Sequence, residues 1–96
     1  MRQLSPVLLR FTAKWCKPCR DVAPQYEKLV KKFSSSQVQF VTVDIDRALD
    51  VANAYEVQSV PTFVLLDGSN RHKVLKRISG GDMEALENAL LNLANS

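Results

Sequence analysis

The chain has 96 residues, of which 46% are hydrophobic and 24% are charged, and its formal net charge is +3. This length and composition are typical of one globular domain and exclude a disordered protein, so we expect residues 1–96 to form a single domain. Lys and Arg residues are scattered among Asp and Glu residues. This distribution argues against nucleic-acid binding, which usually uses a dense basic stripe.

The sequence also argues against a membrane or secreted protein. No apolar run approaches the ~18 residues that a membrane-spanning helix needs. The N-terminal segment has a basic residue, Arg2, near its start, but Arg10 interrupts its short apolar run, so it makes a poor signal peptide. Two cysteines are too few for the framework of a secreted disulfide-rich domain. We therefore expect a cytoplasmic protein, where a purely structural disulfide is the least favoured role for a cysteine pair.

The first half of the chain predicts a strand, a helix and a second strand. Residues 6–12 form an apolar run typical of a buried strand. Residues 18–33 place apolar side chains at helical spacing, with charged residues between them. Pro18 falls in the first helical turn, where proline is tolerated, and Pro24 should kink the helix. Residues 38–46 predict a strand that is buried on both faces, as in a parallel sheet.

The second half predicts a short helix, a hairpin and a final helix. Asp46 is expected to cap a helix over residues 47–55. Residues 62–67 and 74–79 predict two antiparallel strands joined by turn residues. Asp82 caps the last helix, whose apolar stripe consists of Met83, Leu86, Leu90 and Leu93. The order β-α-β-α-β-β-α indicates an α/β sandwich, with a mixed sheet of about four strands and helices on both faces.

Cys16 and Cys19 are the two cysteines, and they lie where a strand gives way to a helix. The positive end of the helix dipole favours a thiolate at Cys16, and the charge of Lys17 acts weakly in the same direction. Cys19 comes round to the same side of the first turn, closer to the sheet and less accessible. An exposed thiolate with a shielded partner is what dithiol exchange requires.

A C-x-x-C pair alone is also compatible with half of a zinc site or with two inert buried cysteines. A structural zinc ion needs four ligands, and the remaining soft or nitrogen donors amount to His72. His72 lies in a polar turn typical of a solvated side chain, so we expect no metal site. Pro18 and the strand–helix junction favour a redox loop over inert cysteines.

Three segments in order along the chain resemble the thioredoxin family: WCKPC (15–19), VDID (43–46) and VPTF (60–63). The resemblance extends over nearly the whole chain. It implies a thioredoxin-like three-layer sandwich and a thiol–disulfide oxidoreductase that reduces protein disulfides without a bound cofactor. It further implies recharging by a thioredoxin reductase or by a small dithiol.

The resemblance also implies roles for individual residues. Cys16 would attack the substrate disulfide, and Cys19 would resolve the mixed disulfide. Val60 would offer backbone groups to an extended substrate peptide, and Pro61 would be a cis-proline facing the disulfide. The substrate groove would comprise Trp15, Lys17, Pro18, Val60, Pro61 and Gly80.

The chain departs from the family pattern at its start. Typical thioredoxins begin with an extra strand and helix, whereas a few residues precede the first strand expected here. The sheet edge left open would be a liability unless something covers it. We therefore expect a homodimer or another partner at this edge.

A second departure is Arg10. The family usually carries a buried aspartate there, which accepts a proton beneath the resolving cysteine, and arginine cannot take up a proton at neutral pH. An inward-pointing Arg10 would stabilise thiolates and make the couple more oxidising. Alternatively, its side chain extends to solvent.

Further departures leave the function partly open. Lys17 and Pro18 stand where the family usually has Gly-Pro, and the hairpin loop over residues 67–73 is longer than usual. Two alternatives to a disulfide reductase follow from these departures. One is a thioredoxin-like binding module with little redox turnover, and the other is a more oxidising, isomerase-like dithiol protein.

Overall fold

Strands and helices follow one another in the predicted order throughout residues 5–70 and 73–94, which the computed structural model describes. The elements are β1 (Val7–Thr12), α1 (Lys17–Lys32), β2 (Gln39–Asp44), α2 (Leu49–Ala54), β3 (Thr62–Leu66), β4 (Val74–Ser79) and α3 (Met83–Ala94). The prediction for His72 lies outside the described residues. The expected hairpin is confirmed, because β3 and β4 pair antiparallel.

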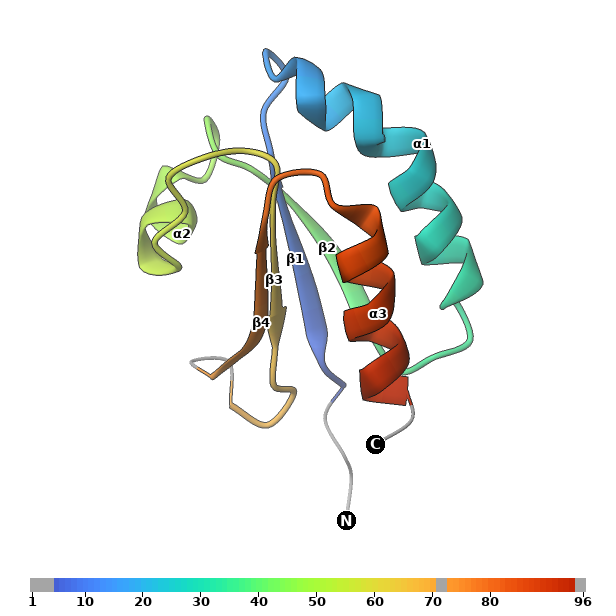
Figure 1. The fold of residues 1–96 in the computed structure, drawn as a ribbon. Coiled ribbons are helices and arrows are strands. Elements are labelled where there is room, and N and C mark those ends of the chain that lie inside the picture. Colours follow the sequence, from blue (N-terminus) through green and yellow to red (C-terminus); the bar gives the residue numbers. More distant parts are fainter. Residues whose placement is uncertain (1–4, 71–72, 95–96) are drawn as a thin grey trace.

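The four strands form one mixed sheet in the order β2-β1-β3-β4. Strand β1 pairs parallel with β2 on one side and antiparallel with β3 on the other. Helix α2 covers one face of the sheet, and α1 and α3 lie side by side on the other (Figure 1). The predicted three-layer α/β sandwich is therefore confirmed.

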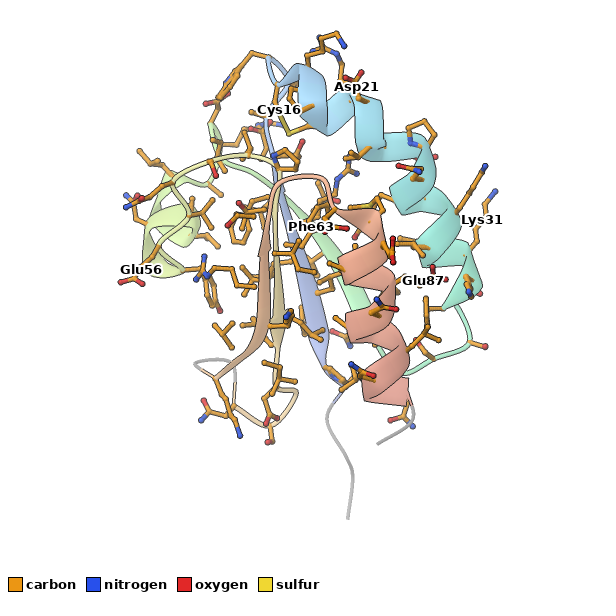
Figure 2. The ribbon with its side chains drawn as sticks, viewed as in Figure 1. Cys16, Asp21, Lys31, Glu56, Phe63 and Glu87 are labelled. Carbon is orange, nitrogen blue, oxygen red and sulfur yellow. A yellow bond between two sulfur atoms is a disulfide. The ribbon has the colours of Figure 1, made fainter. Side chains whose placement is uncertain are left out.

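Alternating side chains of β1 fill two apolar cores. Leu8 points into the core that α1 and α3 close, together with Phe63 of β3, which lies in the middle of the molecule (Figure 2). Leu9 and Phe11 point into the core beneath α2. Because successive side chains of a strand alternate between faces, Arg10 must share the face of Leu8 and lie beneath α1.

Helix α1 begins at Lys17, with Cys16 as its N-cap and Pro18 in its first turn, as predicted. The helix continues through Pro24, and its axis changes direction along its length (Figure 1). Its buried face includes Tyr26 and Leu29, which match the predicted stripe. Tertiary packing of this stripe, more than helix propensity, stabilises such an element.

Strand β2 is less buried than its apolar sequence predicts. Val43 is buried, but Val41 is 42% exposed and Thr42 is also exposed. The strand pairs with β1 alone within the described residues, and the short helix α2 packs against Val43 without covering Val41. The prediction of burial on both faces was therefore wrong, because a local apolar run does not reveal whether a neighbour lies outside it.

Asp46 does not cap α2, contrary to the prediction. The helix begins at Leu49, and Ala48 is its N-cap without a side-chain hydrogen bond. Asp46 therefore lies too far ahead of the first turn, and its carboxylate faces Trp15 instead.

Helix α3 follows its prediction. The carboxylate of Asp82 accepts the backbone N–H of Ala85 at 3.0 Å, which is a capping hydrogen bond. The predicted stripe faces the core: Met83, Leu86 and Leu90 are buried, and Leu93 packs against them. Ahead of this helix, Gly81 comes close to α1, because a Cβ atom there would lie 2.5 Å from Cγ1 of Val22.

We expect Gly81→Ala to lower the free energy of unfolding by about 1–3 kcal/mol, the usual cost of an overpacked contact. Val22 is β-branched and cannot easily rotate away from an added methyl group. Urea unfolding under oxidising conditions measures the change.

The control is the same substitution in a Val22→Ala background, where the contact is absent. There Gly81→Ala should be neutral or stabilising by up to about 1 kcal/mol, because alanine restricts the unfolded chain more than glycine does. Equal losses in both backgrounds would contradict the contact as the cause.

Candidate active site

The two cysteines lie at the carboxyl end of β1, where the chain turns into α1 (Figure 2). They form a disulfide with their Cα atoms 5.3 Å apart. The backbone N–H of Cys19 points at Sγ of Cys16, 3.1 Å away, in the first helical turn. This arrangement follows from the N-cap position of Cys16, since N-cap side chains accept N–H groups that the helix leaves free.

The surroundings of the two sulfur atoms differ more than their exposure does. Cys16 is 3% exposed and Cys19 is 2% exposed, so the predicted difference in accessibility is absent from the oxidised form. Packing explains this burial, because the disulfide lies against Ala13, Ile45 and Val60. Sγ of Cys16 lies 3.5 Å from the carbonyl oxygen of Val60, whereas Cys19 lines a cavity beneath α1.

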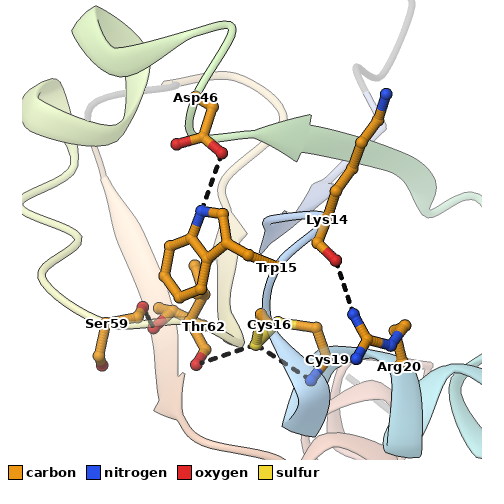
Figure 3. Close-up of a disulfide and its surroundings, with 9 residues drawn as sticks. Lys14, Trp15, Cys16, Cys19, Arg20, Asp46, Ser59 and Thr62 are labelled. Atoms are coloured by element: carbon orange, nitrogen blue, oxygen red, sulfur yellow. Dashed lines mark hydrogen bonds between the residues drawn. A yellow bond between two sulfur atoms is a disulfide. The ribbon is translucent and has the colours of Figure 1, made fainter.

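Trp15 borders the disulfide and is 65% exposed. Its indole N–H donates to the carboxylate of Asp46 at 2.9 Å, which holds the ring beside the cysteines (Figure 3). The sequence did not reveal this role of Asp46. The available signal for this role was the position of Asp46 at the end of the VDID segment, just after a strand that pairs with β1.

The loop before β3 forms the opposite wall of the site. The Val60–Pro61 peptide bond is cis, as the resemblance implies. The hydroxyl of Thr62 donates to the carbonyl oxygen of Ser59 at 2.7 Å, and the N–H of Gly80 donates to the carbonyl oxygen of Pro61 at 2.8 Å. Gly80 has a φ of 93°, a left-handed conformation that favours glycine. These hydrogen bonds fix the loop that faces Cys16.

Lys17 and Pro18 are exposed at the start of α1, beside the disulfide. The ammonium group of Lys17 lies 2.8 Å from the carboxylate of Asp21, one helical turn further on. Since this ion pair is exposed and screened by solvent, the charge of Lys17 contributes little to a thiolate at Cys16.

Arg10 points inward, which decides between the two orientations considered from the sequence. Its guanidinium carbon lies 4.7 Å from the ring centre of Tyr26 on α1. Its Nε atom is buried and has no hydrogen-bond partner among the described residues. Arg10 and Cys19 line the same cavity of about 300 Å³.

The described residues contain no group of three or more His, Cys, Asp or Glu side chains that could hold a metal ion. Across the same part of the chain, no helix combines the length and the apolar character that crossing a membrane requires.

A disulfide at a helix N-terminus, facing a fixed loop and an exposed tryptophan, defines a thiol–disulfide oxidoreductase with a thioredoxin-like fold. The family model for thioredoxin matches residues 1–92. The chain belongs to the thioredoxin family.

Individual relatives agree with this assignment. Thioredoxin Asp f 28 of Aspergillus fumigatus is 39% identical over 90 residues, which cover 93% of this chain and 79% of that protein. Thioredoxin H4 of Arabidopsis thaliana is 38% identical over 81 residues, which cover 84% of this chain and 65% of that protein. This chain therefore spans part of the length of each relative.

Solved structures have the same fold. The thioredoxin of Trypanosoma brucei brucei matches with a TM-score of 0.87 and 26% identity, covering 100% of this chain and 80% of that chain. The thioredoxin of Fasciola hepatica matches with a TM-score of 0.82 and 32% identity, covering 94% of this chain and 82% of that chain.

We expect the stability of the protein to fall between pH 10 and pH 12 because of Tyr26. Burial raises the pKa of Tyr26 from 10.0 to about 12, although the charge of Arg10 opposes this rise. In this interval the unfolded chain releases the tyrosine proton and the folded chain keeps it, so raising the pH favours unfolding. The loss relative to Tyr26→Phe should reach about 2 kcal/mol, measured by urea unfolding at each pH.

Tyr26→Phe is also the control at neutral pH. The Tyr26 hydroxyl is buried without a hydrogen-bond partner among the described residues, so its removal should leave the free energy of unfolding unchanged or higher. Parallel pH profiles for the two proteins would contradict the assignment to Tyr26.

Proposed function

We propose that residues 1–96 act as one thioredoxin-like domain that reduces protein disulfides through Cys16 and Cys19 in the cytoplasm. A thioredoxin reductase or a small dithiol would return the oxidised protein to its dithiol form. The observation that carries this proposal is the Cys16–Cys19 disulfide at the start of α1, where Cys16 faces the carbonyl oxygen of Val60.

The proposed reaction has two exchange steps. The thiolate of Cys16 attacks one sulfur of the substrate disulfide, so a Cys16–substrate bond forms and the other substrate sulfur leaves as a thiolate. The thiolate of Cys19 then attacks Sγ of Cys16, which forms the Cys16–Cys19 bond and releases the second substrate thiolate. Both released thiolates take protons from solvent. Two electrons pass in total from the dithiol to the substrate.

The groove beside the disulfide would hold an extended substrate peptide. Trp15, held by Asp46, supplies an exposed aromatic surface on one side. Val60 and Pro61 supply the opposite wall, and the remaining groove residues of the proposal are Lys17, Pro18 and Gly80. An extended peptide is the form that exposed backbone groups recognise best. We assign no metal ion or bound cofactor to this reaction, because the sulfur atoms carry the electrons.

We expect the protein to catalyse the reduction of insulin by dithiothreitol, followed as turbidity from the released B chain. Cys16→Ser should abolish the acceleration, because Cys16 is the attacking thiolate in the proposal. Cys19→Ser should also lose the acceleration, and without dithiothreitol its reduced form should accumulate a covalent insulin adduct on Cys16, which added dithiothreitol releases.

These two variants separate an enzyme from a binding module. A binding module would give wild-type and Cys16→Ser proteins with equal rates, and that result would contradict the proposal. An adduct on Cys19→Ser also provides a trap for the physiological substrate, because the resolving thiol is missing.

We further propose that a second copy of the chain covers β2. Within the described residues, β2 pairs with β1 alone, and Val41 is 42% exposed on it. The strand carries no Lys or Pro that would discourage edge pairing. Antiparallel pairing of two β2 strands about a two-fold axis would satisfy the same backbone groups in both copies.

We expect size-exclusion chromatography with light scattering to give twice the monomer mass at high protein concentration. Val41→Lys should shift the protein to the monomer, because a charged residue on an edge strand opposes pairing. Leu75→Lys, on β4 at the other edge of the sheet, should leave the mass unchanged. A wild-type monomer at all concentrations would refute the dimer.

A further inference from the structure

We propose that Arg10 is a positioning residue that stabilises the Cys19 thiolate during the resolving step, in place of a proton-accepting side chain. This inference deepens the proposed function and depends on Cys19 acting as the resolving thiol.

The sheet fixes where the Arg10 side chain lies. Arg10 pairs with Thr42 of β2 on one side and with Phe63 of β3 on the other, so its backbone is held within the sheet. Its side chain lies on the face that α1 covers, with the guanidinium group over the ring of Tyr26. The charge is therefore held between the sheet and the helix that carries Cys19.

Among the charged residues lining the cavity with Cys19, Arg10 is the partly buried cation. The other charged residues there are Lys14, Arg20 and Asp44. Lys14 and Arg20 are exposed, and Arg20 donates to the carbonyl oxygen of Lys14 at 2.7 Å (Figure 3). Solvent screens charges of this kind. Asp44 is partly buried, and its carboxylate accepts the N–H of Asp46 at 3.0 Å.

The guanidinium group of Arg10 lies over a neutral ring. Tyr26 is uncharged at neutral pH, and its ring stacks near Phe63 with the ring centres 5.4 Å apart. A partly buried charge beside an aromatic ring is screened less by solvent than a fully exposed charge. The unpartnered Nε atom of Arg10 is consistent with a group that lacks an anion in the oxidised protein.

The resolving step creates such an anion. After Cys16 has formed a mixed disulfide, Cys19 loses its thiol proton to solvent through the cavity and becomes a thiolate. The electron pair of this thiolate forms the bond to Sγ of Cys16, and the pair of the old disulfide bond leaves on the substrate sulfur. Arg10 favours the charged form of Cys19 without accepting the proton, since a guanidinium group is already protonated.

The titration of Cys19 tests this role. In a Cys16→Ser background, Cys19 is the remaining thiol, and absorbance at 240 nm follows its thiolate. Arg10→Gln should raise the midpoint of the titration by about one pH unit, which leaves about tenfold less thiolate at neutral pH. Lys28→Gln, which removes one exposed positive charge from α1, should change the midpoint by less than about a third of a unit.

The redox equilibrium gives a second readout. With both cysteines present and at a pH above the Cys19 midpoint, Arg10→Gln should make the equilibrium constant with glutathione less oxidising by up to about tenfold, which corresponds to about 30 mV. Arg10→Lys keeps the charge and should retain most of the wild-type value. A purely structural Arg10 would lower the unfolding midpoint of Arg10→Gln without moving either readout, and that result would overturn the proposal.

Two further outcomes decide the remaining cases. A larger change in the Cys19 titration with Asp44→Asn than with Arg10→Gln would show that Asp44, not Arg10, is the dominant charge at Cys19, and would refute the proposal. Should Arg10→Gln fail to fold, the Cys16→Ser protein alone is decisive, because its thiolate midpoint should lie below about 8.5, the value of an ordinary cysteine. A higher midpoint overturns the role of Arg10. Neither measurement uses a protein substrate, so failure of insulin reduction would be distinguishable from failure of this inference.

Discussion

The central position of β1 constrains both the fold and the site. The strand is hydrogen-bonded on both sides, and its alternating side chains face two different apolar cores. The register of β1 cannot shift by one residue without moving Leu8 and Phe11 out of their cores. The end of β1 is therefore fixed in space, and the turn that follows it places Cys16 at the N-cap of α1.

The same constraint explains why the side chain of Arg10 points inward. A long cationic side chain could extend to solvent from an edge strand, but β1 has neighbours on both sides and α1 above it. The aliphatic part of the side chain and the stacked Tyr26 ring reduce the cost of burying the guanidinium group. Tyr26 in turn packs beside Phe63, so the apolar core and the charge depend on one another.

The sequence predicted most of the fold because its strongest signals are local. Apolar periodicity predicted α1 and α3, and turn residues predicted the β3–β4 hairpin. The errors concern properties that depend on neighbours in space. The exposure of Val41 depends on whether another strand lies beyond β2, and its apolar sequence contains no information on that point.

The site shows the same division between local and tertiary signals. The C-x-x-C spacing and the strand–helix junction predicted a redox couple at a helix N-terminus. The hydrogen bond from Trp15 to Asp46 and the close approach of Gly81 to Val22 join residues that are far apart in sequence. A single sequence taken alone gives no signal for such pairs, because neither partner is unusual in its own segment.

Burial, more than proximity along the chain, determines which positive charge can influence the cysteines. Lys17 follows Cys16 directly in the sequence, but its ammonium group is exposed and paired with Asp21. Arg10 is six positions before Cys16 and nine before Cys19, yet it lines the same cavity as Cys19 and carries a buried Nε atom. An exposed charge is screened within about 10 Å at ordinary ionic strength, whereas a partly buried charge is screened less. The two cysteines are almost equally buried, so the division of labour proposed for them rests on their surroundings: the carbonyl oxygen of Val60 beside Cys16, and the cavity that Cys19 shares with Arg10.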